Sequence, residues 1–271
     1  MIGGSGYLGR RLVQQALLAG HRVTATFHAN AVPADGATWH RLDIRRRGDV
    51  TALADGIRPD MIINAAYRQS DWETTAEGGM HVAQAAAATG SGLVHVSTCA
   101  VFSGAAVSYD ENCAPDPVTP YGAAKAAAET AVKGIARGAA IARTSLIVGD
   151  GDSKHERLVH ALASGAEDGL LYTDEVRCPV HVADLSAAIL EMAATRHAGI
   201  RHVAGPDAVS RYELGQLIAA RDGFDPAALR AGPRPADRPG PLNLRLDGTR
   251  TQARLSARLR GAREFLAAVP A

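Results

Sequence analysis

A glycine-rich turn at the start of the chain constrains the fold more than any other feature. Gly3, Gly6 and Gly9 follow the spacing G-x-x-G-x-x-G, which is typical of turns that hold a dinucleotide pyrophosphate. An apolar stripe at helical spacing follows, made of Leu8, Leu12, Val13, Ala16 and Leu17. A helix starting at this turn would point its N-terminal N–H groups and its dipole at the pyrophosphate. Taken alone, the spacing fits an ordinary turn equally well.

The strand that should precede this turn is almost absent, because only Met1 and Ile2 stand before Gly3. A strand usually has about five residues, and the first strand is central in a nucleotide-binding sheet. Its loss would leave unpaired N–H and C=O groups on both neighbouring strands. We therefore expect that the functional start lies several residues upstream, or that the sequence is truncated.

Composition limits the classes of protein that need to be considered. The chain has 271 residues, of which 46% are hydrophobic, so it can bury a sizeable core. Its net charge of +1 gives no electrostatic case for binding nucleic acid or an anionic membrane. No apolar run approaches the ~20 residues that span a bilayer, and the three cysteines lack the C-x-x-C spacing of a metal site. These observations predict a cytoplasmic, soluble protein without a metal site.

Apolar strands and helices alternate along the first part of the chain. Strands are predicted at 22–27, 39–42, 61–64, 93–96 and 139–143, with helices at 51–57, 71–89 and 121–136 between them. This alternation predicts an α/β fold with a doubly wound parallel (Rossmann) sheet. We expect a dinucleotide-binding domain over 1–149, with 181–204 packing back on it. Residues 150–180 and 205–271 are expected to form a smaller substrate lobe.

Two groups of polar residues have the spacing of catalytic groups. Tyr121 and Lys125 lie four residues apart on a predicted helix and therefore share a face. An ammonium beside a phenol favours its ionised form and makes it a stronger acid. Ser97 and Thr98 follow a buried strand, at the sheet edge where α/β proteins bind ligands. Alternatively, Tyr121 and Lys125 are an ordinary surface pair on the helix, and Ser97 and Thr98 belong to an ordinary turn at the end of a strand.

Together these motifs occur in the order of the extended short-chain dehydrogenases/reductases. More narrowly, the chain resembles the dTDP-4-dehydrorhamnose reductase group of nucleotide-sugar 4-keto reductases. The resemblance covers nearly the whole chain. Its motifs are the glycine turn, Asp43-Ile44, Asn64-Ala65-Ala66, the run 97–104, Tyr121-x-x-x-Lys125, and the segments 143–146, 175–185, 202–206 and 210–214.

The resemblance implies a role for each matching residue. The catalytic set would be Thr98, Tyr121 and Lys125. Tyr121 and Lys125 would also contact the cofactor, together with Gly3, Gly6, Tyr7, Leu8, Gly9, Arg10, Asp43, Ile44, Ala65, Ala66 and Tyr67. Substrate contacts would come from Val101, Arg143, Ser145 and Arg177, since arginine can form paired hydrogen bonds with phosphate.

The chain departs from the group at three places, one of which is the nearly absent first strand described above. Cys99-Ala100 stand where the group often has Asp-Tyr, and the run 77–80 lacks an asparagine that is common there. The predicted second strand ends without the carboxylate that favours NAD, and Arg10 lies close to the phosphate turn. We therefore expect NADPH as the cofactor rather than NADH.

The function implied is that of an NAD(P)-dependent oxidoreductase. It would reduce a ketone, namely the 4-keto group of a nucleotide-activated deoxysugar, in deoxysugar biosynthesis of the dTDP-rhamnose type. Two alternatives stay open: a nucleotide-sugar epimerase or dehydratase on the same scaffold, and a non-catalytic nucleotide-binding regulatory subunit. Whether the protein forms a homodimer is also left open.

Overall fold

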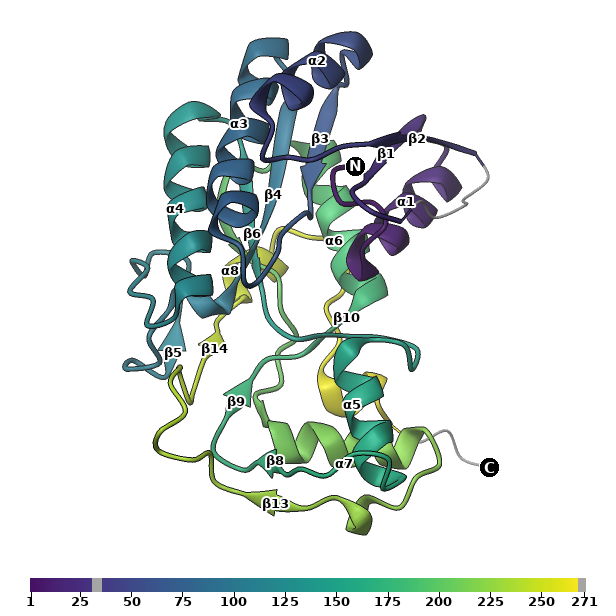
Figure 1. The fold of residues 1–271 in the computed structure, drawn as a ribbon, viewed down its shortest axis with the longest axis vertical. Helices are drawn as coiled ribbons and strands as arrows, with labels where there is room; N and C mark the ends of the chain where they lie inside the picture. The colour runs from purple at the N-terminus through teal and green to yellow at the C-terminus, as the bar shows by residue number, and fades with distance from the viewer. Residues whose placement is uncertain (31–35, 268–271) are drawn as a thin grey trace.

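A parallel sheet with helices on both faces dominates the computed structural model, which describes residues 1–30 and 36–267 (Figure 1). Four parallel strands lie in the order β11-β6-β4-β3. Their bounds are Met61–Asn64 for β3, Gly92–Thr98 for β4, Ala140–Thr144 for β6 and Gly199–His202 for β11. A second parallel pair consists of β1 (Val23–Phe27) and β2 (Ala37–Arg41). The predicted α/β class and parallel sheet are confirmed.

Within residues 1–30 and 36–267, backbone hydrogen bonds join the two parts of the sheet only through Met1 and Ile2. Met1 bonds to β1, because its nitrogen donates to the Thr24 carbonyl at 2.7 Å and its carbonyl accepts from Thr26 N–H at 2.9 Å. Ile2 bonds to β3, donating to the Ile63 carbonyl at 2.9 Å. The gap expected in the middle of the sheet is therefore closed over two residues. The N label lies between β1 and β3 in Figure 1.

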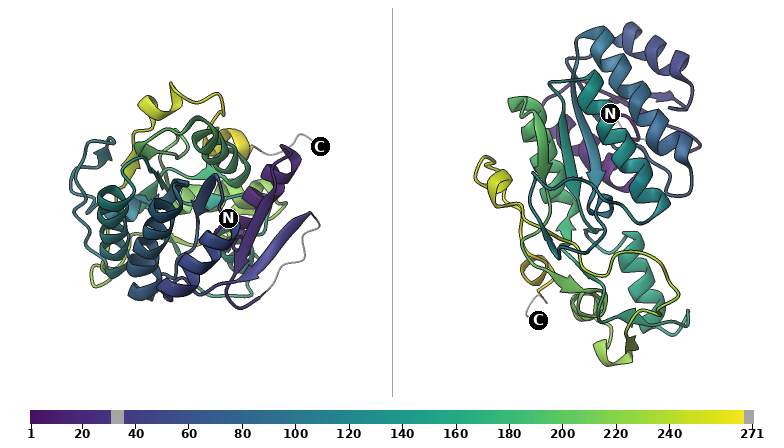
Figure 2. Two further views of the ribbon diagram at one scale, coloured as in Figure 1. Left: turned by 90° about the horizontal axis from the view of Figure 1, so that it is seen from above. Right: turned by 90° about the vertical axis from the view of Figure 1, so that its left-hand side faces the viewer.

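Helices cover both faces of the sheet. α1 (Tyr7–Leu18) and α6 (Val182–Thr195) pack together on one face. On the other face lie α2 (Arg47–Ile57), α3 (Gly78–Thr89) and α4 (Pro120–Ile135), side by side in that order. Figure 2 shows the sheet between these two layers. The apolar faces of the helices and the apolar strands form two cores, as the alternation of strands and helices predicts.

The remaining elements form a smaller unit below the sheet in Figure 1. α5 (Lys154–Ala163) and α7 (Arg211–Arg221) pack around their own apolar core. Short strand pairs border it: β8 (Leu171–Tyr172) with β13 (Ala231–Gly232), and β9 (Val176–Arg177) with β12 (Val209–Ser210). β7 (Ile147–Val148) pairs with β10 (Val180–His181), and β5 (Ser108–Tyr109) with β14 (Arg245–Leu246). α8 (Thr249–Gln252) and α9 (Ala262–Phe265) are single turns. The predicted domain boundaries stay a prediction.

Two segments depart from regular structure. The strand structure is interrupted between β9 and β10 at Pro179, which has no N–H to donate to a ladder. The helix predicted at 71–89 begins with a π-helical turn, Glu73–Glu77, before α3. The hydroxyl of Thr75 in this turn accepts from Arg68 N–H at 3.1 Å and donates to the Arg68 carbonyl at 2.7 Å. Throughout the described residues, we find no helix with the length and apolar character needed to cross a membrane.

Candidate active site

The glycine turn forms a tight cradle at the start of α1. Gly3 has a φ of +78°, a conformation that side-chain-bearing residues rarely adopt. A Cβ on Gly9 would lie 2.1 Å from the Gly3 carbonyl oxygen, so only glycine fits there. Because the cap residue Gly6 has no side chain, it leaves the N–H groups of the first helical turn open to a ligand. These features fit the pyrophosphate of a dinucleotide.

The side chains around this turn divide between the core and the surface. Leu8 is buried against the sheet, so only its backbone can face a ligand. The Tyr7 hydroxyl is buried and has no hydrogen-bond partner among the described residues. The Arg10 guanidinium is 44% exposed; it donates to the Ser5 carbonyl at 3.2 Å and lies 3.5 Å from Asp152.

Asp43 and Ile44, two of the residues predicted to contact the cofactor, are already engaged by the protein. The Asp43 carboxylate accepts from the Arg45 side chain at 2.6 Å and lies 3.6 Å from His28. These partners, led by the Arg45 hydrogen bond, hold the pKa of Asp43 well below its usual range. Ile44 is buried in the core, and its carbonyl accepts a hydrogen bond from the His81 ring at 2.9 Å. Both residues therefore shape the loop after β2.

The loop after β3 brings the glycine turn close to the predicted catalytic residues. Ala65 and Ala66 lie against Gly3, where an added Cβ would be 2.7 Å from the Ala66 nitrogen. The next residue, Tyr67, is half exposed, and its ring centroid is 5.8 Å from that of Tyr121. The Lys125 ammonium lies 5.9 Å from the Tyr67 ring centroid. The structure thus gathers Tyr67, Tyr121 and Lys125 beside the turn.

The first turn of α4 positions Tyr121 beside Thr98. Thr119 caps the helix by accepting from Gly122 N–H at 3.1 Å, and Pro120 follows at the first helical position. A Cβ on Gly122 would lie 2.1 Å from the Ala100 carbonyl oxygen. This glycine therefore allows the turn after Thr98, Cys99–Val101, to pack directly on α4. The sequence analysis missed Gly122.

Burial is the largest cause of the pKa shifts of Tyr121 and Lys125 in this cluster. Burial raises the pKa of the Tyr121 phenol above its ordinary value of 10.0; nearby Tyr67 acts in the same direction, and a hydrogen bond with Thr98 opposes it. Burial lowers the pKa of Lys125 to about 8, while Glu129 acts in the opposite direction. The Lys125 ammonium donates to the Val96 carbonyl at 2.6 Å. In this structure, burial outweighs the lowering of the Tyr121 pKa that was expected from Lys125.

Beneath Lys125, α4 carries a buried charge that the sequence analysis also missed. The Glu129 carboxylate accepts three hydrogen bonds from the Arg143 guanidinium, at 2.7, 3.0 and 3.2 Å, and one from the Ser97 hydroxyl at 2.5 Å. Arg143 and Glu129 are both almost inaccessible, with side chains 0% and 2% exposed. Tyr121, Lys125 and Glu129 are four residues apart, so continued i+4 spacing could have identified Glu129.

Three of the four predicted substrate residues do not face an open site. Arg143 is enclosed with Glu129, and Val101 is fully buried in the core. The Arg177 guanidinium is 9% exposed and donates to the carbonyls of Val176, Pro241 and Leu242, so it fixes a loop. Ser145 is half-buried, and its hydroxyl accepts a weak hydrogen bond from the Cys99 thiol at 3.7 Å. In these conformations Arg143, Val101 and Arg177 support the fold.

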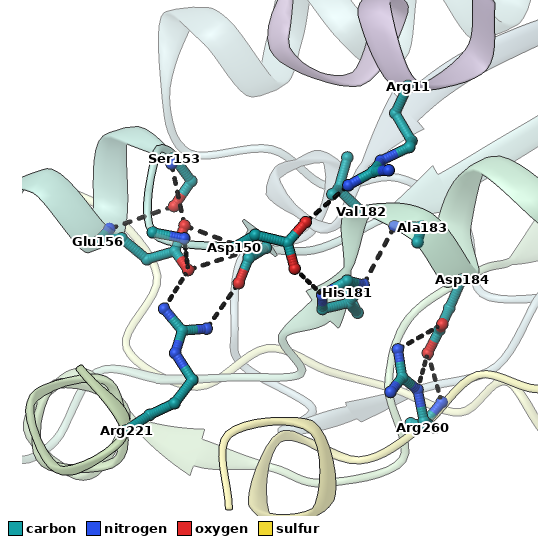
Figure 3. A network of polar contacts seen from close by, with 12 residues as sticks. Arg11, Asp150, Ser153, Glu156, His181, Val182, Ala183, Asp184, Arg221 and Arg260 are labelled. Atoms are coloured by element: carbon teal, nitrogen blue, oxygen red, sulfur yellow. Dashed lines mark hydrogen bonds and ion pairs between the residues drawn. The ribbon is translucent and has the colours of Figure 1, made fainter. Parts of the chain in front are cut away.

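A polar network links α1 to the smaller unit (Figure 3). The Asp150 carboxylate accepts from Arg11 on α1 at 2.6 Å and lies 3.3 Å from the His181 ring. Arg221 on α7 reaches the same loop, donating to Glu156 at 2.8 Å. Glu156 in turn caps α5 together with Ser153. The network holds the loop between β7 and α5 in place below the glycine turn.

Comparison with known proteins identifies the family. The sequence model described as the RmlD substrate binding domain matches residues 1–270. The chain belongs to this family. A dTDP-4-dehydrorhamnose reductase of Mycolicibacterium smegmatis is 31% identical to this family member over 258 residues, 88% of this chain and 74% of that protein. The resemblance inferred from the motifs is confirmed, as is the oxidoreductase class, since homologues are named reductases.

Solved structures of similar proteins share the fold of this RmlD-family chain. A hypothetical dTDP-4-dehydrorhamnose reductase from Sulfolobus tokodaii superposes with a TM-score of 0.82 at 27% identity, covering 96% of this chain and 95% of that one. A dTDP-4-dehydrorhamnose reductase from Bacillus anthracis, solved in complex with NADP, gives a TM-score of 0.81 at 23% identity, covering 98% and 95%. A neighbour from Bordetella bronchiseptica was solved with NAD. Such complexes agree with the expected NAD(P) cofactor.

Proposed function

We propose that this protein is an NAD(P)H-dependent reductase of a nucleotide-activated 4-keto-deoxysugar. One observation carries the proposal: Thr98, Tyr121 and Lys125 converge beside Tyr67 and the glycine turn, at the carboxyl ends of β3 and β4. Family membership and the names of the relatives support the same substrate class. NADPH is the preferred cofactor in this proposal, because the partly exposed Arg10 guanidinium lies at the phosphate turn.

Each residue of the cluster has a distinct role in the proposed reaction. The cofactor, held by the glycine turn and the loop after β3, supplies a hydride when bound. Tyr121 donates its proton to the substrate oxygen as that oxygen gains negative charge. The raised pKa keeps the phenol protonated at neutral pH, which is the form that a proton donor needs. The Thr98 hydroxyl donates a hydrogen bond to the same oxygen.

Lys125 acts on the tyrosine after the proton has left. Its ammonium lies among buried groups, where a charge interacts more strongly than in water. It therefore stabilises the tyrosinate that remains on Tyr121. With a pKa of about 8, Lys125 keeps most of its charge at neutral pH.

Replacement of one hydroxyl group tests the proposal. In Tyr121→Phe, we expect turnover of a dTDP-4-keto-6-deoxyhexose to fall by about 10²- to 10⁴-fold, measured as NADPH oxidation. The dissociation constant for NADPH, measured by fluorescence, should change little. Tyr172→Phe, a matched loss of a hydroxyl on β8 in the smaller unit, should leave turnover unchanged. Equal turnover by Tyr121→Phe and the parent chain would refute the assignment.

The same assay separates a reductase from the alternative enzymes. A reductase consumes one NADPH for each product formed, whereas an epimerase or dehydratase returns the hydride and consumes none. A chain that binds NADPH but oxidises none with any keto sugar would favour the non-catalytic alternative.

A further inference from the structure

A hollow lined with positive charges lies at the outer edge of the sheet, away from the candidate active site. It has a volume of about 250 Å³ and borders β11, the outer strand of the four-stranded part of the sheet. Lys133, which lines it, lies in the last turn of α4, whereas Tyr121 lies in the first turn. This helix of 16 residues is about 24 Å long. The hollow is therefore separate from the cluster around Tyr121.

Four cationic side chains from three segments line the hollow. Arg201 lies on β11 and Lys133 on α4. Arg250 belongs to the single turn α8, and Arg254 follows that turn. Within residues 1–30 and 36–267, none of the four forms an ion pair with a carboxylate. Ion pairs with the described part of the chain therefore do not neutralise this positive charge.

Arg201 shows that gathering these charges is unfavourable. Its Nη1 donates to the Ile200 carbonyl at 2.8 Å, but its Nε is buried without a hydrogen-bond partner among the described residues. Burial lowers the pKa of the Arg201 guanidinium below its ordinary value of 12.5. The charges of Arg254 and Arg250 lower this pKa further, while Glu111 opposes them. An anion placed between these cations would remove the repulsion.

A carboxylate in the wall of the hollow determines which anion fits. Glu111 is 9% exposed, and its Oε1 accepts a hydrogen bond from the Thr251 hydroxyl at 2.8 Å. Its Oε2 is buried and has no partner in the described part of the chain. An ionised carboxylate can only accept hydrogen bonds. An anion that carries an O–H group can donate to Glu111, whereas a fully ionised anion is repelled. Inorganic phosphate keeps at least one P–OH group at neutral pH, and sulfate keeps none.

From this unpaired positive charge we infer that the hollow binds inorganic phosphate in a protonated form. The cations hold its ionised oxygens through charge-assisted hydrogen bonds, and Glu111 accepts a hydrogen bond from its P–OH group. The hollow of about 250 Å³ has room for one phosphate ion and a few waters of about 30 Å³ each. The site lies apart from the proposed reaction and does not depend on it.

Calorimetric titration with sodium phosphate, at neutral pH and constant ionic strength, tests the site. The parent chain should bind phosphate saturably. Arg254→Gln should weaken this binding by at least about tenfold, because a hydrogen bond to a charged group is lost. Arg258→Gln is the matched control, since it removes the same charge further along the same segment. The Arg258 side chain is 72% exposed and pairs with Glu264 outside the hollow, so the dissociation constant should stay within about twofold of the parent value.

Two further measurements check the roles of the charged groups. Arg254 is exposed and lies among like charges, so Arg254→Gln should not lower the Tm of the phosphate-free protein. Sulfate should bind the parent chain at least about tenfold more weakly than phosphate at the same ionic strength. Glu111→Gln should reduce this difference, because the amide group can donate a hydrogen bond to sulfate.

Several results would overturn the inference. One is the absence of saturable phosphate binding up to about 10 mM. Equal weakening by Arg254→Gln and Arg258→Gln would indicate nonspecific attraction, and equal affinity for phosphate and sulfate would remove the role of Glu111. A lower Tm for phosphate-free Arg254→Gln would mean that this arginine already has a partner within the protein. Weaker phosphate binding in Arg254→Gln alone, with sulfate discriminated against, would establish the site even if the chain has no reductase activity.

Discussion

Lys125→Met is expected to make the protein more stable at neutral pH while removing its activity. The ammonium is buried, and its pKa falls from 10.5 to about 8. At about 1.4 kcal/mol per pKa unit, this difference corresponds to about 3 kcal/mol of cost for keeping the charge in the folded state. Methionine has a similar length and carries no charge, so this cost disappears.

One interaction opposes this gain. The Lys125 ammonium donates to the Val96 carbonyl at 2.6 Å, a bond that methionine cannot make. Loss of such a bond costs about 1 to 2 kcal/mol. We therefore expect Lys125→Met to raise the free energy of unfolding by about 1 to 2 kcal/mol at pH 7.

The pH dependence provides the sharper test. Below pH 8 the lysine is charged in both the folded and the unfolded state, so its full cost is present. Between about pH 8 and 10.5 the unfolded chain binds more protons than the folded one, and the parent gains stability as the pH rises. The advantage of Lys125→Met should therefore vanish or reverse by about pH 10.

Urea unfolding followed by circular dichroism at pH 7, 8, 9 and 10 measures this difference. Lys133→Met, at an exposed position on the same helix, should show no comparable pH-dependent difference from the parent. Two results would refute the reasoning. One is a Lys125→Met chain clearly less stable than the parent at pH 7, and the other is a stability difference that stays constant from pH 7 to 10.

Three further predictions concern the same helix. Turnover should fall as the pH rises through about 8, where Lys125 loses its charge, and a pH–rate profile from 6 to 10 checks this. Gly122→Ala should reduce turnover strongly, because its Cβ would lie 2.1 Å from the Ala100 oxygen and displace the turn that holds Thr98. Glu129→Gln should destabilise the fold by about 3 to 5 kcal/mol in urea unfolding, because it leaves the Arg143 charge buried without its partner.

Each of these three predictions has either a matched control variant or a result that would contradict it. Gly134→Ala, on the same helix with open space around it, should be neutral or slightly stabilising and leave turnover unchanged. A rate that stays level up to pH 10 would speak against the role of the Lys125 ammonium. If Glu129→Gln were as stable as the parent, the prediction would be wrong and Arg143 would have another partner. Adding Arg143→Met to Glu129→Gln should in that case leave the free energy of unfolding unchanged.

The sequence predicted the sheet well because local patterns determine it. Met61–Asn64 and Gly92–Thr98 contain short apolar runs with β-branched residues, and their length and composition favour buried strands between helices. The cluster of Tyr121 and Lys125 with Tyr67 was also predictable, because helical spacing and strand ends place these residues at one edge. These inferences needed no knowledge of distant contacts.

Pairings between distant residues were not predictable in the same way. The family resemblance implied that Arg143 binds substrate, since arginine can form paired hydrogen bonds with phosphate. Its partner Glu129 lies on the preceding helix, and only the fold brings the two together. The contacts of Arg177 illustrate the same limit, since the carbonyls of Pro241 and Leu242 that accept its hydrogen bonds lie more than sixty residues away.

The buried pair of Glu129 and Arg143 limits which single substitutions this chain can accept. Either charge alone would be left in the core without its partner, so a change of one residue needs a matching change of the other. Residues that face open space carry no such constraint. Attempts to alter the substrate preference of this protein by single substitutions should therefore start in the loops of the smaller unit and leave the buried pair beneath Lys125 unchanged.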